Sequence, residues 1–221
     1  MGRIKILIAD DHAVVRDGTR QILEHESDMD VVAEAADGSE AIKLAGTSRP
    51  DVAIIDIAMP GVDGIEATRQ IKSLYPSVAV LILSAYDDDQ FVFNLLEAGA
   101  AGYLLKSVRG RELIDAVRQV YAGESVLHPA IARKVLNRFV PAASKTSGQK
   151  TTEMLSEREI EVLKLATRGF SNQDIADELC LSLRTVQAHL GHIFNKLQVS
   201  SRTEAVVRAL KEGWVTLEDI P

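Results

Sequence analysis

The chain has 221 residues, 46% of them hydrophobic and 26% charged, with one cysteine and a formal net charge of −7. This length allows one large domain or two modest ones, and the composition excludes a mainly disordered chain, a collagen and a coiled coil. One cysteine excludes a disulfide framework and a cysteine-rich metal site. No run approaches the roughly 20 apolar residues that cross a bilayer. We therefore expect a cytoplasmic protein without membrane contact, and the acidic balance argues against a general nucleic-acid coat protein.

The first 125 or so residues alternate short apolar runs with segments of helical periodicity. The apolar runs lie at residues 4–9, 29–36, 52–57, 78–83 and 102–105, and the helical segments at 13–24, 38–45, 64–74, 88–98 and 111–122. Runs that are apolar almost throughout suit strands covered on both faces. Alternation of strands and helices predicts an α/β fold, namely a flavodoxin-like doubly wound sheet of five parallel strands.

The second half of the chain has no strand signal. Residues 128–140 predict one more helix, and residues 141–152, PAASKTSGQKTT, have the composition of a flexible linker. Four helices are then expected: one capped by Ser156 and ending near Gly169, one capped by Ser171, one over 183–197 and one over 202–211. The short turn that joins the second and third of these helices is typical of a helix-turn-helix. We expect domain boundaries of 1–125, 126–152 for the helix and linker, and 153–221 for a small all-α domain.

Polar residues follow four of the apolar runs. Asp10 and Asp11 follow the first run, Asp56 lies near the end of the third, Ser84 ends the fourth, and Lys106 follows the fifth. Because parallel strands end at one edge of a sheet, these side chains should converge where such folds bind ligands. Clustered carboxylates favour Mg²⁺ or Ca²⁺ over zinc. A magnesium site with an open edge suits phosphoryl transfer, and an aspartate can itself be the nucleophile.

These motifs resemble the receiver domain of bacterial two-component response regulators. The resemblance rests on Asp10-Asp11, the Asp56 of IIDIAMPGVDG, Ser84-Ala85 and Lys106. It implies that Asp56 is the phosphoacceptor and that a sensor histidine kinase is the phosphoryl donor. The residues that it assigns are Asp11, Asp56 and the carbonyl of Ala58 as Mg²⁺ ligands, Asp10 as a ligand through water, Lys106 as a phosphate contact, and Ser84 and Tyr103 as the switch pair.

Residues 155–206 resemble the LuxR-type DNA-binding domain. The best matches are the Leu-Ser-x-Arg-Glu start, the Asn-Gln-Asp-Ile-Ala segment, Thr185-Val186 and the closing Lys196-Leu197. A receiver joined to this domain is the NarL/FixJ class of response regulators, in which the helix over 183–197 would enter the major groove. The candidate DNA contacts are Arg184, Thr185, Gln187, Ala188, Gly191, His192, Lys196 and Arg202.

The charge of the second half fits this resemblance only in part. From residue 150 on, 9 Lys and Arg stand against 11 Asp and Glu, so this half is near neutral and not basic. Gln187 can read adenine and Ala188 can contact a thymine methyl, whereas Gly191 reads nothing. Fewer cations mean fewer phosphate contacts and weaker nonspecific binding. We therefore expect weak DNA binding until two copies act together.

The sequence thus predicts a transcription regulator that is controlled by phosphorylation. Phosphorylation of Asp56 would favour a homodimer that binds promoter DNA, and a contact with RNA polymerase is left open. An aspartyl-phosphate enzyme such as a phosphatase is disfavoured, because it needs a second acidic residue two positions after the nucleophile and position 58 is alanine. A regulator that works without phosphorylation is the remaining alternative, and the altered recognition helix is its support.

Overall fold

The computed structural model describes residues 2–85, 94–95, 97–127, 155–212 and 214–215. In the first part the elements are β1 (Ile4–Ala9), α1 (Ala13–Glu24), β2 (Met29–Ala35), α2 (Gly38–Ser48), β3 (Val52–Ile55), α3 (Gly64–Leu74), β4 (Ala79–Ser84), β5 (Gly102–Leu105), α5 (Gly110–Tyr121) and β6 (Val126–Leu127). In the second part they are α7 (Glu157–Thr167), α8 (Asn172–Glu178), α9 (Leu183–Leu197) and α10 (Arg202–Lys211). The expected helix and linker at 128–152, and most of the helix expected over 88–98, lie outside the described residues.

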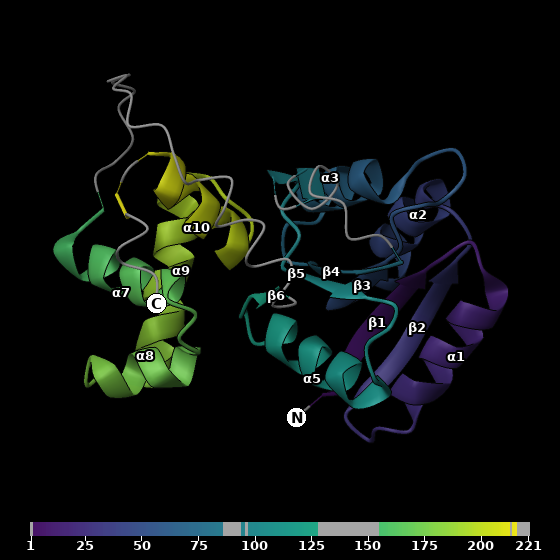
Figure 1. Cartoon of the computed structure of the whole chain (residues 1–221), viewed down its shortest axis with the longest axis horizontal. Coiled ribbons are helices and arrows are strands. Elements are labelled where there is room, and N and C mark those ends of the chain that lie inside the picture. Colours follow the sequence, from purple (N-terminus) through teal and green to yellow (C-terminus); the bar gives the residue numbers. More distant parts are fainter. Residues whose placement is uncertain (1, 86–93, 96, 128–154, 213, 216–221) are drawn as a thin grey trace.

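The sheet has the order β2-β1-β3-β4-β5-β6, and every neighbouring pair is parallel. The expected doubly wound α/β sheet is confirmed, and the two-residue strand β6 extends it at the β5 edge. The sequence does not predict β6, because two residues are too few to show a strand pattern. Figure 1 shows helices on both faces of the sheet, with α5 and α1 on one side and α2 and α3 on the other.

Alternation along the strands divides the core into two layers. On β1, Ile4, Ile6 and Ile8 pack into one cluster, whereas Leu7 and Ala9 pack into the other. The same alternation holds on β3, where Ile54 and Ile55 face opposite layers. Successive side chains of a strand point to opposite faces, so runs that are apolar throughout need helices on both sides.

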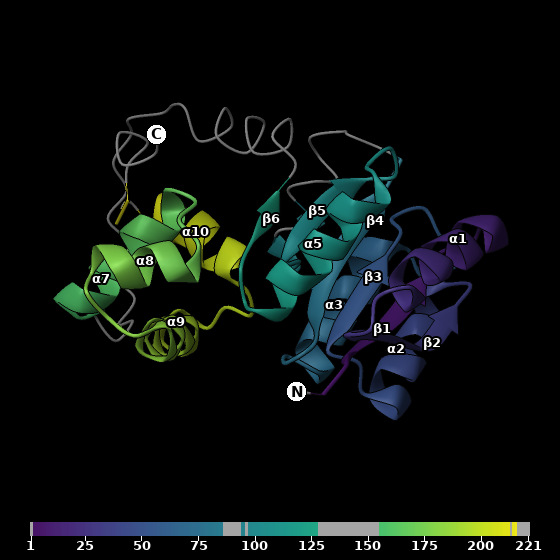
Figure 2. The same cartoon turned by 90° about the horizontal axis from the view of Figure 1, so that it is seen from below.

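The helical part has its own core. Side chains such as Val162, Ile175, Val186 and Ile193 are buried together from α7, α8 and α9. Ser156 and Ser171 each start a helix with a complete capping box, which satisfies backbone N–H groups that the first turn leaves unpaired. In both Figure 1 and Figure 2 this helical unit lies beside the β5–β6 edge of the sheet. Among the described residues, no helix is both long and apolar enough to cross a membrane.

Candidate functional site

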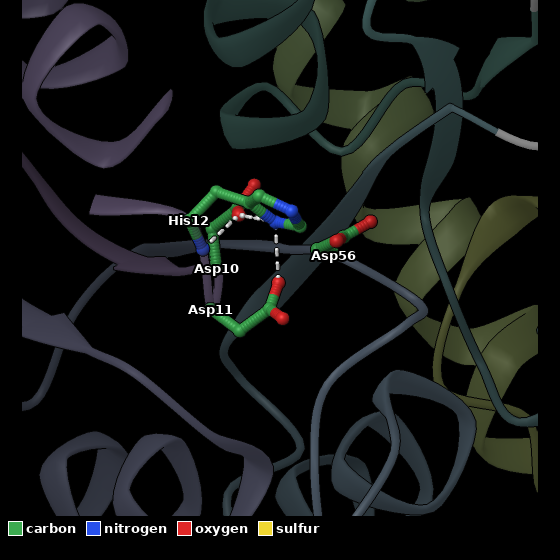
Figure 3. Close-up of side chains that lie close together, drawn as sticks. All are labelled: Asp10, Asp11, His12 and Asp56. Carbon is green, nitrogen blue, oxygen red and sulfur yellow. Dashed lines mark hydrogen bonds and ion pairs between the residues drawn. The ribbon is translucent and has the colours of Figure 1, made fainter. Parts of the chain in front are cut away.

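The acidic side chains meet at the carboxyl edge of the sheet. β1 ends at Ala9 and β3 at Ile55, so Asp10 and Asp56 leave adjacent strands at the same level, and the Asp56 N–H donates to the Ala9 carbonyl over 2.8 Å. One oxygen each from Asp10, Asp11 and Asp56, with a ring nitrogen of His12, all lie within 4.8 Å of one another. Figure 3 shows the four side chains close together, with dashed lines from His12 to Asp10 and Asp11. Asp10 and Asp56 are buried, whereas Asp11 and His12 are exposed.

Lys106 bridges the two buried carboxylates. Its Nζ lies 2.7 Å from Oδ2 of Asp10 and 2.8 Å from Oδ2 of Asp56. The Lys106 N–H donates to the Ser84 carbonyl over 2.7 Å, which anchors the residue beside the end of β4. One ammonium thus pairs with two carboxylates. The three groups together keep a net negative charge, which a bound cation would offset.

The pKa values of Asp56 and Lys106 are displaced by burial and by the neighbouring charges. Burial raises the pKa of Asp56 above its ordinary value, and the nearby Asp10 adds to this, although the hydrogen bond from Lys106 opposes it. Burial alone would lower the pKa of Lys106, but the bonds to Asp10 and Asp56 outweigh it and raise the pKa. The site therefore holds its lysine charged and has carboxylates that are costly to bury without a cation.

His12 belongs to this cluster, which the sequence analysis did not foresee. Its Nδ1 lies 2.6 Å from Oδ1 of Asp11 and 3.4 Å from Oδ1 of Asp10. The His12 N–H also donates to Oδ1 of Asp10 over 2.9 Å. Only its position directly after the two aspartates could have indicated this contact. The same position is equally typical of a residue at the start of a helix.

The remaining residues assigned to this site lie on adjoining elements. Ser84 ends β4 and is fully buried, and Tyr103, on β5, is fully buried in the core layer that contains Ile82 and Leu95. Ala58 is exposed in the loop that follows Asp56. Ser84 and Tyr103 therefore lie on the neighbouring strands β4 and β5, and Lys106 directly follows β5.

Most candidate DNA contacts share the open side of α9. Ser182 caps this helix through the Thr185 N–H, and Val186, Leu190 and Ile193 face the core. The side chains on the other side are exposed at Arg184, Gln187, Ala188 and His192, and partly exposed at Thr185 and Gly191. The burial pattern thus separates a core face of α9 from a face that is free to meet a groove.

Two of the candidate DNA contacts, Lys196 and Arg202, have partners within the protein. Lys196 Nζ lies 2.8 Å from Oε2 of the buried Glu159. Burial pushes the pKa of Glu159 up, but bonds from Lys196 and Ser156 more than offset it, so that pKa lies below its ordinary value. The expectation that Arg202 contacts DNA is wrong, because its side chain is buried and donates to Oδ1 of Asn172 and to the carbonyls of Ala166 and Phe170.

Gly191 offers a direct test of the exposed face. A Cβ added there would meet no heavy atom within 4 Å, and glycine inside a helix costs roughly 0.5–1 kcal/mol relative to alanine. We expect Gly191→Ala to raise the free energy of unfolding by about that amount in urea titrations. Gly169→Ala is the matched control, because its φ of +81° should make alanine destabilising. Equal effects at both positions would contradict this account of α9.

Two family models together match most of the chain. Residues 6–118 match the response regulator receiver domain, and residues 153–209 match the bacterial regulatory proteins of the luxR family. The chain is 44% identical over 213 residues to the oxygen regulatory protein NreC of Staphylococcus epidermidis, covering 95% of this chain and 98% of NreC. It is 40% identical over 225 residues to the transcriptional regulatory protein DegU of Brevibacillus brevis, covering 96% and 95%.

Solved structures agree with these matches. The response regulator ChrA of a heme-sensing two-component system is 40% identical, with a TM-score of 0.53 over 97% of this chain and 100% of that one. RcsB, solved as two dimers bound to two parallel DNAs, is 27% identical, with a TM-score of 0.56 over 97% and 100%. The chain thus belongs to the two-component response regulators, and it joins a receiver domain to a LuxR-type DNA-binding domain in the manner of the NarL class.

Proposed function

We propose that phosphorylation of Asp56 switches this regulator between two states of DNA binding. The Lys106 ammonium bridges Asp10 and Asp56 at the edge of the sheet, and this arrangement is the main support for the proposal. An Asp56 oxygen attacks the phosphorus of a phosphohistidine on a sensor kinase, the P–N bond breaks, and the imidazole takes up a proton. Apart from gaining and losing its own phosphoryl group, the chain has no enzymatic reaction in this proposal.

The donor set fits Mg²⁺. Asp11, Asp56 and the Ala58 carbonyl would hold the ion, with Asp10 acting through water, and hard oxygen donors are the ligands that Mg²⁺ prefers. Bound there, Mg²⁺ would offset negative charge on the transferring phosphoryl group. Lys106 would hold one phosphoryl oxygen and Ser84 would donate to another. Tyr103 on β5 would respond to the displacement of Ser84 and Lys106.

Mg²⁺ should stabilise the protein in the absence of any phosphoryl donor. A ligand that binds only the folded state raises stability by an amount that grows with the logarithm of its concentration, about 2.7 kcal/mol at a hundred times Kd. We expect millimolar MgCl₂ to raise the unfolding temperature. Asp11→Ala should remove the increase, whereas Asp30→Ala, exposed on β2, should keep it. An increase that survives Asp11→Ala would exclude this ligand set.

The output is proposed to be promoter binding by a homodimer in the cytoplasm. The open face of α9 would enter the major groove through Arg184, Thr185, Gln187, Ala188, Gly191, His192 and Lys196. Lys196 would first have to leave, or share, its contact with Glu159. Two copies on adjacent half-sites would supply the affinity that one cation-poor helix lacks. We propose a receiver over residues 1–125, a helix and linker over 126–152, and a DNA-binding domain over 153–221. A contact with RNA polymerase is left open.

DNA binding tests this output. Genomic fragments selected by the phosphorylated protein would be titrated with both forms across a range of salt concentrations. We expect at least tenfold tighter binding after phosphorylation, with log affinity falling steeply against log salt. Asp56→Asn should bind as the unphosphorylated protein does. Equal affinity in both states would favour a regulator that works without phosphorylation, and a flat salt dependence would exclude groove docking by α9.

A further inference from the structure

The receiver and the DNA-binding domain share a polar contact that we call the seam. It is formed by Asn172 and residues 201–203 on one side, and by residues 100–101 and 122–125 on the other. The first turn of α10 carries part of it. Thr203 Oγ1 donates to the Ala101 carbonyl over 3.1 Å and lies 2.8 Å from the Ser125 hydroxyl, which can donate to it in turn.

Asn172 joins the two domains through its backbone N–H and its side-chain Nδ2. Its backbone N–H donates to Oε1 of Glu124 over 3.1 Å, and its Nδ2 donates to the Ala122 carbonyl over 3.2 Å. Its Oδ1 accepts from Arg202 over 2.9 Å, so the same side chain is fixed from within its own domain. Asn172 is 1% exposed. Buried amides are costly to leave unpaired, so this side chain favours the docked arrangement.

Apolar packing and charge support the same arrangement. Val207, on α10, is buried in the receiver core layer that also contains Val80 and Ala100. Ser201 Oγ donates to the Ala100 carbonyl over 3.3 Å. The buried Lys72 ammonium of α3 is attracted to Glu204 of α10, although burial lowers the pKa of Lys72 to about 8. Hydrogen bonds, apolar packing and electrostatic attraction therefore favour the position of α10 and the start of α8 against the receiver.

The seam leaves the recognition face of α9 uncovered. Arg184, Gln187 and His192 are exposed while the seam is closed, and a Cβ at Gly191 would enter open space. Figure 2 shows α9 end-on, below α8 and α10 in that view. The hydrogen bonds of the seam come from α8 and the start of α10, so docking and groove reading use different surfaces of the same domain.

We propose that the seam is a latch that fixes the orientation of the DNA-binding domain on the receiver without masking its recognition helix. The latch limits how two copies can present α9 to neighbouring half-sites, and it does not limit access of DNA to one copy. Part of its receiver half, residues 100–101, leads directly into β5, and Lys106 follows the other end of that strand. The effect of the latch on how two copies present α9 to DNA rests on the proposed function, whereas the docking of the two domains does not.

Distance measurements on the full chain test the docking. Spin labels would be placed at Lys43→Cys and Glu157→Cys, both exposed, in a Cys180→Asn background. We expect one narrow distance distribution for the parent protein and a broad one for Glu124→Ala with Thr203→Val. Glu124→Ala alone, on the receiver surface, provides a variant that keeps both cores intact. Gln119→Ala, exposed at the end of α5, is the matched control and should leave the distribution narrow.

Binding of a random-sequence duplex at low salt tests the open recognition face. An orientation latch predicts affinities within about twofold for the parent and the double variant, because the binding-competent fraction is the same in both. A tenfold gain on opening the seam would show masking and overturn that half of the proposal. A narrow distribution in the double variant, or a broad one in the parent, would overturn the latch itself, whatever the role of Asp56.

Discussion

Asp56→Asn is expected to gain no mass when the protein is incubated with a small phosphoryl donor and Mg²⁺, whereas the parent gains the mass of one phosphoryl group. The amide lacks the anionic oxygen that must attack phosphorus, and it cannot form the acyl phosphate. The change is nearly isosteric, so the Ile57 N–H still finds an oxygen acceptor where it now bonds to Oδ1 of Asp56. Intact-mass spectrometry gives the result directly.

The control for this variant is another aspartate at the same end of the molecule. Asp17→Asn, on α1, changes a carboxylate that lies outside the acidic cluster, and it should leave the mass gain unchanged. Phosphorylation that survives Asp56→Asn would move the acceptor elsewhere. Fragmentation of the modified chain would then separate Asp10 and Asp11, the two carboxylates close enough to substitute, from more distant sites.

Arg202→Met is expected to destabilise the DNA-binding domain by about 3 kcal/mol, because unpaired buried acceptors cost about 1–3 kcal/mol each. The arginine now serves two carbonyls and Oδ1 of Asn172. Burial lowers its pKa to about 10, which shows that the site is costly for a cation and offsets part of the loss. Trp214, the single tryptophan of the chain, packs against the core of this domain, so its fluorescence in urea reports the effect.

Arg184→Met is the matched comparison. Arg184 is exposed at the start of α9, and exposed substitutions change stability by about 0.5 kcal/mol or less. We therefore expect Arg184→Met to lower DNA affinity with little change in stability, and Arg202→Met to lower the free energy of unfolding. Similar unfolding curves for both would show that the Arg202 network contributes little.

The sequence predicted the elements that local pattern and strand direction determine. The bounds expected for the helices at 183–197 and 202–211 are those of α9 and α10, because a tight turn precedes the first and apolar spacing marks the second. Asp10, Asp56 and Lys106 were expected to converge, and their side chains do meet within hydrogen-bonding distance. Parallel strands leave no other edge for residues that follow them, so this part of the site needs no tertiary knowledge.

Contacts between distant elements could not be read in the same way. Arg202 looks like any surface cation in the sequence, and only its partners on α8 and the preceding turn reveal that it is buried. Lys196 has the same ambiguity, because Glu159 lies 37 residues away. His12 touches both neighbouring aspartates, yet nothing in its spacing separates that from a solvated helix start. Each of these depends on which helices pack together, and periodicity does not encode that.

All-parallel pairing has a consequence for the order in which the protein forms during synthesis. β1 pairs with β2 on one side and with β3 on the other, where Ile8 lies opposite Ile54. β1 therefore stays half-paired until the chain has been made as far as β3. Pairing between strands that are far apart in the sequence slows folding. The helices α7 to α10 contact one another over shorter sequence separations, which favours rapid folding. The helical domain, which is translated after the receiver, is thus expected to fold on the shorter timescale, so the receiver limits the folding rate of the two domains.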